Sequence, residues 1–431
     1  MPLSRVAVIG AGAREHAIAA VLARDVEVLL VPGNPAMAGV SSEGNAIRCL
    51  AVDPEQLDAL PEPIDLVVIG PEAPLVDGLA DRLRAKGLLV FGPGAAGAQL
   101  EGSKAFMKDL AHRAGVPTAR YGVFTEQAEA EAFLDTLGPI YVIKTDGLAA
   151  GKGVLVTDDL VEARHDIAEK LSGNAFGAAG RRVIIEEGMV GPELSLLVLC
   201  ANGHGVALPP AQDFKRIFDA DAGPNTGGMG AYSPVPVATT AIVHEIMERI
   251  VHPTLRQLQA EGIDYRGVLY AGCMLTAEGP KLIEYNIRFG DPEAEVVLPR
   301  LTSNLAESLA EVARGGHINE PTVTSEATVC VVIAAEGYPG SVRSGDVITG
   351  LAEASTVKGV QLFHAGTSTG SDGSVTTAGG RVLCVSARGV DLAEARQRAY
   401  QAVGAISFAG MQFRSDIAQL AAATLREKDP Q

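Results

Sequence analysis

A glycine-rich loop with a lysine, GLAAGKGV at residues 147–154, has the composition of a phosphate-binding segment. Its backbone N–H groups are bare enough to approach oxyanions, and Lys152 adds a positive charge between Gly151 and Gly153. It does not match the P-loop pattern G-x-x-x-x-G-K-[ST], because only three residues separate Gly147 from Gly151 and glycine replaces the hydroxyl residue. Taken alone, these residues also fit a solvated hairpin turn.

Two further lysines complete a set of three candidate cations for phosphate. Lys144 ends the apolar strand YVIK directly before the loop, and Lys104 lies in the segment EGSK. One ion contact at ~4 Å in a partly screened site is worth about 4 kcal/mol. A nucleotide polyphosphate would therefore need several such contacts and a metal ion. The alternative is a solvated lysine at an exposed strand end.

The segment KLIEYNIRFGDPEAE (281–295) carries the candidate metal ligands. Strand alternation puts Glu284, Asn286 and Arg288 on one face. The opposite face is then apolar, with Ile283, Tyr285 and Ile287. Carboxylate and amide oxygens suit Mg²⁺ or Mn²⁺, and Arg288 is placed to meet an anion. A strand with a merely hydrated polar face is the alternative, but the turn residues and carboxylates that follow favour the metal.

Three loops with glycine or proline follow predicted strands in the first hundred residues: GAGAREH (10–16), PGNP (32–35) and GPEAP (70–74). The carboxyl ends of parallel strands meet at one edge of a sheet, where ligands bind in such folds. Three loops of similar chemistry at that edge therefore predict a binding site.

The first of these loops is a partial dinucleotide fingerprint. Gly10 and Gly12 fit G-x-G-x-x-G, but Glu15 occupies the third glycine position. Arg14 and the N-terminal amides of the following helix suit a single phosphate. A plain strand-to-helix turn fits the loop equally well.

Three other segments offer polar residues beside glycine. QDFKR (212–216) supplies Asp213 and Lys215. GPNTGGMGAYSP (223–234) is expected to be a long functional loop whose glycines direct backbone amides into a site. In RRVIIEEGMVGPELS (181–195), Glu186 and Glu187 end a strand that can present its backbone to an adenine edge. Glu193 is then placed for a ribose hydroxyl, although surface carboxylates are the simpler interpretation.

Composition excludes several classes of protein. The 431 residues are too many for one ordinary core and indicate two to four domains. With 35 Lys and Arg against 52 Asp and Glu, the formal net charge is −17, which argues against nucleic acid or an anionic membrane as partner. The five cysteines are scattered without a CxxC pair, and no signal peptide or membrane span is evident. We expect a cytoplasmic protein.

The elements that position these residues alternate as in an α/β fold. Apolar strands and helices alternate through residues 1–102, which predicts a doubly wound parallel sheet. Residues 120–190 resemble a compact α+β unit, and a mixed segment continues to about 320. Strands near 327–389 and a closing helix indicate a last α+β domain. The fold class is therefore multidomain, α/β followed by α+β.

These motifs resemble, in order, those of the glycinamide ribonucleotide synthetase (phosphoribosylamine–glycine ligase) family of the ATP-grasp superfamily. The resemblance rests on GAREH, PGN, GPEAPLV, LEGSKAF, IKTDGLAAGKGV, GPNTGGMGAYSP and IEYNIRFGDPE, and it covers essentially the whole chain. It implies an N-terminal domain over 1–102, an ATP-grasp domain over 103–325 with a mobile lid at about 122–189, and a C-terminal domain over 326–431. It also implies a monofunctional ligase in purine biosynthesis, which we expect to be a monomer.

The resemblance implies that ATP activates glycine as glycyl phosphate, which the amine of 5-phosphoribosylamine then attacks. Mg²⁺ or Mn²⁺ would be held by Glu284 and Asn286, and the catalytic residues would be Arg288, Lys144 and Asp213. ATP would be bound by Lys104, Lys144, Gly151, Lys152, Gly153, Glu186, Glu187, Met189 and Glu193. The other substrates would be bound by Gly12, Arg14, Glu15, Gly33, Asn34, Gly70, Pro71, Glu72, Asp213, Lys215, Gly227, Gly228, Met229 and Arg288. Arg288 would meet either the glycine carboxylate or the sugar phosphate.

Two departures from the family pattern concern substrate contacts. Thr145 stands where alanine is usual, and Phe214 where histidine is usual. Three rival interpretations remain: another ATP-grasp carboxylate–amine ligase, a nicotinamide-dependent oxidoreductase and a non-catalytic nucleotide sensor. Glu15 and the lack of an acidic residue after the second strand argue against the oxidoreductase, while the presence of Lys144, Glu284 and Asn286 argues against a sensor.

Overall fold

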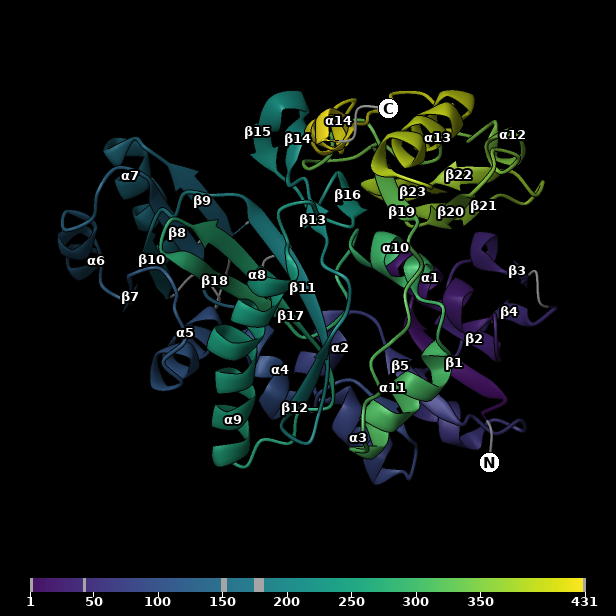
Figure 1. Ribbon diagram of the computed structural model, residues 1–431, viewed down its shortest axis with the longest axis horizontal. Helices are drawn as coiled ribbons and strands as arrows, with labels where there is room; N and C mark the ends of the chain where they lie inside the picture. The colour runs from purple at the N-terminus through teal and green to yellow at the C-terminus, as the bar shows by residue number, and fades with distance from the viewer. Residues whose placement is uncertain (1–2, 42–43, 149–152, 174–181, 429–431) are drawn as a thin grey trace.

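The computed structural model describes residues 3–41, 44–148, 153–173 and 182–428 of the chain. Figure 1 shows the N-terminal region at the lower right, a small sheet with two helices at the left, and the C-terminal region at the top. A central sheet lies between these three regions. No described helix has the length and apolar character needed to cross a membrane.

The N-terminal region is built on a six-stranded sheet in the order β3-β4-β2-β1-β5-β6. β1 pairs in parallel with both β2 and β5, so the predicted parallel sheet is confirmed except at one edge, where β3 pairs antiparallel with β4. Short apolar runs such as VAVI in β1 are buried because helices cover both faces. The elements are β1 Arg5–Gly10, α1 Ala13–Leu22, β2 Glu27–Pro32, η1 Pro35–Met37, β3 Gly39–Val40, β4 Ala46–Cys49, η2 Pro54–Ala59, β5 Leu66–Ile69, α2 Glu72–Val76, α3 Leu79–Ala85, β6 Val90–Phe91 and α4 Ala95–Gly102.

The small sheet at the left of Figure 1 has the order β7-β10-β8-β9 and is antiparallel throughout. Its apolar side chains form a hydrophobic core of their own with helices α6 and α7. A separate core is what a unit that moves as one body requires. The elements are α5 Lys104–Arg113, β7 Tyr121–Phe124, α6 Gln127–Leu134, β8 Tyr141–Thr145, β9 Val154–Thr157, α7 Leu160–Leu171 and β10 Val183–Glu187.

The central sheet has the order β12-β11-β17-β18 and is also antiparallel. α9 packs against its strand β12, and α5 contacts β18 and pairs with the small sheet through Lys108 and Glu186. The elements are β11 Glu193–Ala201, β12 His204–Ala207, α8 Thr240–Ile246, the π-helix η5 Met247–Val251, α9 His252–Ala260, β17 Gly267–Thr276 and β18 Gly279–Asn286.

The C-terminal sheet has the order β13-β16-β19-β23-β20, so two of its strands come from before residue 235. Four short elements link it to the central region: α10 Ala294–Val297, η6 Leu298–Arg300, β14 Arg216–Phe218 and β15 Ala222–Asn225. The others are β13 Gln212–Asp213, η4 Asp219–Asp221, β16 Gly230–Ser233, α11 Leu305–Arg314, β19 Ala327–Ala334, α12 Leu351–Ala354, β20 Val360–His364, β21 Thr367–Thr369, β22 Val375–Thr377, β23 Arg381–Gly389, α13 Leu392–Ala405 and α14 Gln419–Lys428.

The expectation of a long loop over residues 223–234 is wrong at both ends, because β15 (Ala222–Asn225) already pairs with β14 at its start. β16 (Gly230–Ser233) is a buried strand of the C-terminal sheet and pairs with β19. The glycines that precede it, at 227 and 228, remain in a turn.

Candidate functional site

Two of the three lysines predicted to bind phosphate, Lys104 and Lys144, lie near each other at the edge of the small sheet. Lys104 begins α5, and its ammonium donates to the carbonyl oxygen of Gly147 at 2.9 Å, where the glycine-rich loop starts. Lys144 lies in β8 and is buried, and its ammonium is 2.8 Å from Glu186 Oε1 on β10. Burial lowers the pKa of Lys104, partly against the attraction of Glu284. The structure thus places both lysines beside the start of the glycine-rich loop at residues 147–154.

Glu284 in β18 is surrounded by positive charge. Burial alone would raise the pKa of its carboxyl, but nearby cations outweigh burial and hold the pKa below its usual value. These cations are Lys215, Lys144, Lys104 and Arg288. Three of these cations also pair with other carboxylates, Lys144 with Glu186, Lys215 with Glu193 and Arg288 with Glu101. The gathering of ammonium and guanidinium groups beside Glu284 suits a polyanionic ligand with its metal ion.

Asn286 and Arg288 are hydrogen-bonded to each other and to the N-terminal region. Arg288 Nη2 donates to Asn286 Oδ1 at 2.9 Å and to Glu101 Oε1 at 2.7 Å, and its Nε donates to Glu72 Oε2 at 3.2 Å. The amide oxygen of Asn286 keeps a second lone pair. With Glu284 two residues earlier, Asn286 therefore provides the hard oxygen donors that a divalent cation needs.

A β-bulge at Ile283 changes the predicted alternation of β18. The register with β17 shifts there, opposite Gly272 and Cys273. Leu282 fills the core instead, whereas Ile283 is only half-buried. The prediction that Ile283 lies on the buried face with Tyr285 is therefore wrong, because the extra residue breaks the two-residue period.

Glu15 organises the N-terminal loops. Its carboxylate accepts hydrogen bonds from the backbone N–H of Gly12 at 2.7 Å and from Arg14 Nε at 2.7 Å. A Cβ at Gly10 would lie 2.5 Å from Glu15 Cγ, and one at Gly70 would lie 2.2 Å from Oε1. These two loops therefore close over Glu15, which explains why the third fingerprint position is not glycine. The backbone N–H of Gly33 donates to the Gly10 carbonyl at 3.1 Å, so all three loops meet.

Arg14 and Glu72 connect these loops to the end of β18. Arg14 Nη1 donates to the Phe289 carbonyl at 3.3 Å, and its Nη2 is 3.9 Å from Glu72 Oε2. That carboxylate also binds Arg288. Glu72 begins α2, directly after Pro71 as its N-cap.

Asn34 lies between the N-terminal and C-terminal regions. Its Nδ2 donates to the Ala365 carbonyl at 3.2 Å, and its Oδ1 accepts from the backbone N–H of Ala36 at 3.0 Å. Thr367 Oγ1 donates to the same oxygen at 3.4 Å. Both polar groups of the side chain are thus already used within the protein.

Asp213 and Lys215 lie beside the cations described above. Burial raises the pKa of Asp213 to about 7, against the opposing charge of Lys215, and the nearby carboxylates of Glu293 and Glu193 raise it further. The Lys215 ammonium is 2.6 Å from Glu193 Oε2. Glu193, predicted to meet a ribose hydroxyl, therefore pairs with a lysine in this structure.

The turn at residues 227 and 228 is held by two residues of the C-terminal region. Arg381 Nη1 donates to the carbonyl oxygen of Gly227 at 2.6 Å and to that of Asp291 at 2.9 Å. Tyr338 accepts a hydrogen bond at its hydroxyl from the backbone N–H of Gly227 at 3.0 Å. Gly228 has φ +111°, and a Cβ there would lie 2.4 Å from the ring of Pro292. Met229 follows and is buried.

Some predicted nucleotide contacts are placed only in part. Gly151 and Lys152 lie outside the described residues. The carbonyl oxygen of Gly153 accepts from the backbone N–H of Thr145 at 2.9 Å and from its hydroxyl at 3.2 Å. Thr145, one of the two departures, thus fastens the end of the loop. Glu187 accepts from the backbone N–H of residue 120 at 3.0 Å, and Met189 is half-buried.

The other departure, Phe214, packs inside the protein. Its ring lies 4.9 Å below the guanidinium of Arg414 and 6.2 Å from the ring of Tyr232. The side chain therefore contributes packing and no hydrogen bond.

The prediction from the sequence did not include three residues that lie in or beside the site. Lys108 is buried against Glu186, Glu101 holds Arg288, and Arg381 holds the glycine turn. Signals existed for two of them, because Lys108 follows Lys104 by one helical turn and Glu101 opens the segment EGSK.

Asp291, Glu295 and Cys384 form a second cluster of potential ligand atoms, all within 4.8 Å of one another. Glu295 is fully buried, and among the described residues neither of its carboxylate oxygens has a hydrogen-bond partner. Burial, together with the charge of Asp291, raises the pKa of Glu295 well above its usual value. Arg381, 3.0 Å from Asp291 Oδ1, supplies a cation to this cluster.

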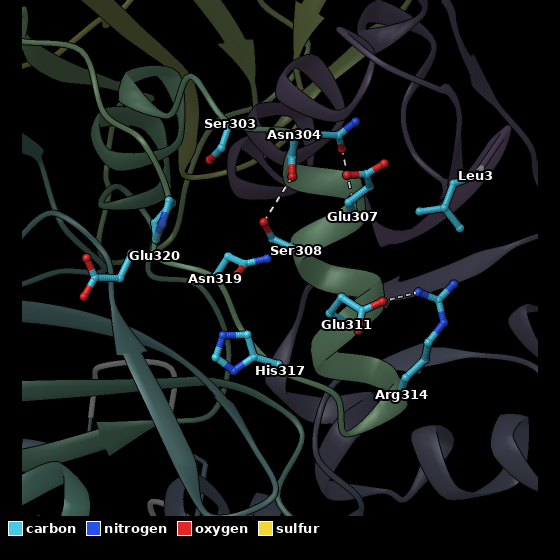
Figure 2. Close-up of a pocket in the computed structure, with 11 residues that line it drawn as sticks. Leu3, Ser303, Asn304, Glu307, Ser308, Glu311, Arg314, His317, Asn319 and Glu320 are labelled. Atoms are coloured by element: carbon cyan, nitrogen blue, oxygen red, sulfur yellow. Dashed lines mark hydrogen bonds and ion pairs between the residues drawn. The ribbon is translucent and has the colours of Figure 1, made fainter. Parts of the chain in front are cut away.

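A hollow of about 430 Å³ lies along α11, away from the predicted site residues. Figure 2 shows that its polar side chains bond to neighbours on the same helix: Asn304 to Glu307 and Ser308, and Glu311 to Arg314. These side chains do not converge on a common point, so the hollow has no feature of a specific site.

Comparison with known proteins agrees with this arrangement. Three family models cover the chain: "Phosphoribosylglycinamide synthetase, N domain" at residues 4–101, its "ATP-grasp (A) domain" at 102–294 and its "C domain" at 328–420. Phosphoribosylamine–glycine ligase from Caulobacter vibrioides is 48% identical over 95% of this chain and 96% of its own length. The Escherichia coli K12 ligase is 48% identical over 96% of this chain and 97% of its own length.

A crystal structure of phosphoribosylamine–glycine ligase from Thermotoga maritima superposes with a TM-score of 0.81 at 35% identity, covering 96% of this chain and all of the other. The resemblance found in the motifs is therefore confirmed along the length of the sequence and in three dimensions. The chain belongs to the phosphoribosylglycinamide synthetase family.

Proposed function

We propose that this protein is an ATP-dependent ligase that joins glycine to 5-phosphoribosylamine, giving glycinamide ribonucleotide, ADP and phosphate in purine biosynthesis. The observation that carries the proposal is the convergence of four cations on Glu284, within a chain that matches all three family models. Several cations gathered at one place in a protein of net charge −17 suit an anionic ligand, and a nucleotide triphosphate is such a ligand.

In this proposal Lys104 and Lys144 bind the ATP phosphates, together with Lys152 and Gly153 of the loop. Glu284 and Asn286 hold Mg²⁺ or Mn²⁺, which when bound neutralises charge on phosphate oxygens. The strand end with Glu186, Glu187 and Met189 frames adenosine. Since the Glu186 carboxylate is committed to lysines, only its backbone is available to the base.

The glycine carboxylate attacks the terminal phosphorus of ATP, which forms glycyl phosphate and releases ADP. The amine of phosphoribosylamine then attacks the acyl carbon, phosphate leaves, and the amine loses a proton. Asp213, with a pKa of about 7, is suited to accept that proton. Arg288 binds an anionic group of glycine or of the sugar phosphate, and the loops over Glu15, with Asn34, Glu72 and Lys215, bind phosphoribosylamine. Catalysis then rests on positioning and charge neutralisation.

An isotope experiment tests this route. With glycine labelled by ¹⁸O in its carboxylate, one labelled oxygen is expected in the released phosphate, because that oxygen bonds to phosphorus in the intermediate. Phosphate without label would exclude glycyl phosphate. ADP release without phosphoribosylamine at the full rate would instead indicate another ligase or an ATPase.

The boundaries 1–102, 103–325 and 326–431, the movement of residues 122–189 as a lid, the monomeric state and the cytoplasmic location stay predictions. The order of substrate binding can be measured by steady-state kinetics.

A further inference from the structure

Lys108 is a fully buried lysine one helical turn after Lys104 in α5. Its ammonium donates to Glu186 Oε2 at 2.8 Å and to Thr118 Oγ1 at 2.7 Å. It also lies 5.5 Å from the centroid of the Tyr121 ring. Each of the three ammonium hydrogens therefore has a partner, and this lysine is built into the fold rather than directed at a ligand.

Glu186 joins Lys108 to Lys144. Its carboxylate is 2% exposed, and its two oxygens face one lysine each, both at 2.8 Å. Burial would raise the pKa of Glu186, but the two lysines hold it below its usual value, so the carboxylate stays ionised. Two ammonium groups and one carboxylate leave a net charge of +1. If Lys108 were absent, the Glu186 carboxylate would neutralise the charge of Lys144 completely.

Thr118 extends the contact to the strand with the candidate metal ligands. Its hydroxyl accepts from Lys108 and donates to the Leu282 carbonyl at 2.7 Å, which accounts for its single hydrogen. The backbone N–H of Leu282 donates to the carbonyl of residue 117 at 2.8 Å. Leu282 precedes Glu284 by two residues, so Lys108 links the sheet that carries Lys144 to the strand that carries Glu284.

We propose that Lys108 is a positioning residue for nucleotide binding. It shares the Glu186 carboxylate with Lys144, keeps a net positive charge available to the ATP phosphates, and fixes β8 relative to β18. The inference rests on the proposed function, in which Lys144 and Glu284 act on the two sides of the same polyphosphate.

The test compares Lys108→Met with wild type in the full-length chain. Calorimetric titration with MgATP is expected to show a dissociation constant raised about tenfold or more, because small misplacements in such sites cost up to about 100-fold. The KM for glycine should stay unchanged. A purely structural role would lower the unfolding temperature without this separation between ATP and glycine.

Lys170→Met is the matched control. Lys170 is also buried, and its ammonium contacts Asp166 within α7, on the outer side of the small sheet (Figure 1). Its loss should lower stability and leave the MgATP dissociation constant within about twofold of wild type.

The double variant Lys108→Met/Glu186→Gln keeps the test decisive if the single variant does not fold. It removes both buried charges together, so the folding penalty of an unpaired carboxylate disappears. Because Lys144 alone then keeps the net charge of +1, the double variant leaves the charge unchanged and isolates the link between β8 and β18, and weak MgATP binding in it supports the positioning role. A wild-type dissociation constant in either variant overturns it. A wild type that binds MgATP but forms no glycinamide product would contradict the proposed function and leave the Lys108 measurement valid.

Discussion

The charge on individual side chains explains why Glu284 is the most sensitive residue of the site. It is the carboxylate on which four cations converge, and it offers the oxygen donors for a divalent ion. Glu284→Ala should abolish ATP-dependent turnover, a loss of at least about 100-fold, and leave the fold intact because the side chain is not in the core. ADP formation and circular dichroism measure the two effects.

Glu278→Ala is the control for that substitution. Glu278 lies in the turn before β18 and pairs with Lys281 at an exposed position, so its loss should change neither property. Mg²⁺-dependent turnover near the wild-type rate in Glu284→Ala would refute the assignment of the metal ligand.

The pKa of Asp213 predicts a pH dependence for the ligase reaction. Burial raises this pKa to about 7, and the carboxylate must be ionised to accept the proton of the attacking amine. Activity should therefore rise with pH through about 7 and level off above it. Asp213→Asn should lower kcat by about 10²-fold or more and remove this acid limb. A wild-type limb retained in Asp213→Asn would assign the titration to another group.

Residues whose type and spacing indicate a ligand can be predicted from the sequence. Residues that depend on a partner far away in the sequence cannot. Lys144, Glu284 and Asn286 can be proposed as site residues from residue type and spacing alone. Lys108 was missed because its partner Glu186 lies 78 residues away and only the tertiary fold buries the pair. Residue type alone also suggested a ribose contact for Glu193, without showing that Lys215 lies 2.6 Å away.

Helix α10 carries a buried carboxyl group, that of Glu295. Ala294–Val297 packs against β16 and β19, and Glu295 is enclosed there without a hydrogen-bond partner among the described residues. Burial and Asp291 raise its pKa, so the folded protein binds a proton that the unfolded chain releases above about pH 4.3. The stability from this proton is complete below that pH and is lost as the pH rises toward the raised pKa.

Glutamine keeps the shape of a neutral Glu295 and cannot ionise. Glu295→Gln should therefore match wild type near pH 4.5 and become more stable than wild type at pH 8. Thermal unfolding at the two pH values measures this difference. Glu353→Gln, at an exposed position of α12, should show no such divergence. Parallel pH curves for wild type and Glu295→Gln would mean that Glu295 is ionised in the fold.

Elements with local signals were predicted well, and those set by distant pairing were not. The apolar run in β1 and the following turn specify a parallel strand locally. β16 escaped detection because its glycines resemble a loop, and only β19, almost 100 residues later, pairs it into a sheet. The bulge at Ile283 is likewise set by the pairing of β18 with β17.

In the whole molecule, contacts between regions hold the site together. The N-terminal loops reach the end of β18 through Arg14 and Glu72, and they reach the C-terminal region through Asn34. An acidic protein that binds anions must gather its cations locally, and residues from several regions do this here. The site should therefore respond to changes in a domain that contributes no predicted substrate contact.

Arg381 on β23 tests this coupling. Its guanidinium holds the carbonyl oxygens of Gly227, in the glycine turn proposed to bind substrate, and of Asp291, in the segment that follows β18. Arg381→Ala should free the glycine turn and raise the KM for phosphoribosylamine about tenfold, while the MgATP dissociation constant changes little because the lysine side of the site is untouched. Arg388→Ala on the same strand, whose side chain pairs with Glu326 at a half-exposed position, should leave both constants unchanged. Equal kinetics for the two variants would show that the C-terminal region supports the site through bulk packing alone, since only a specific clamp distinguishes these two arginines.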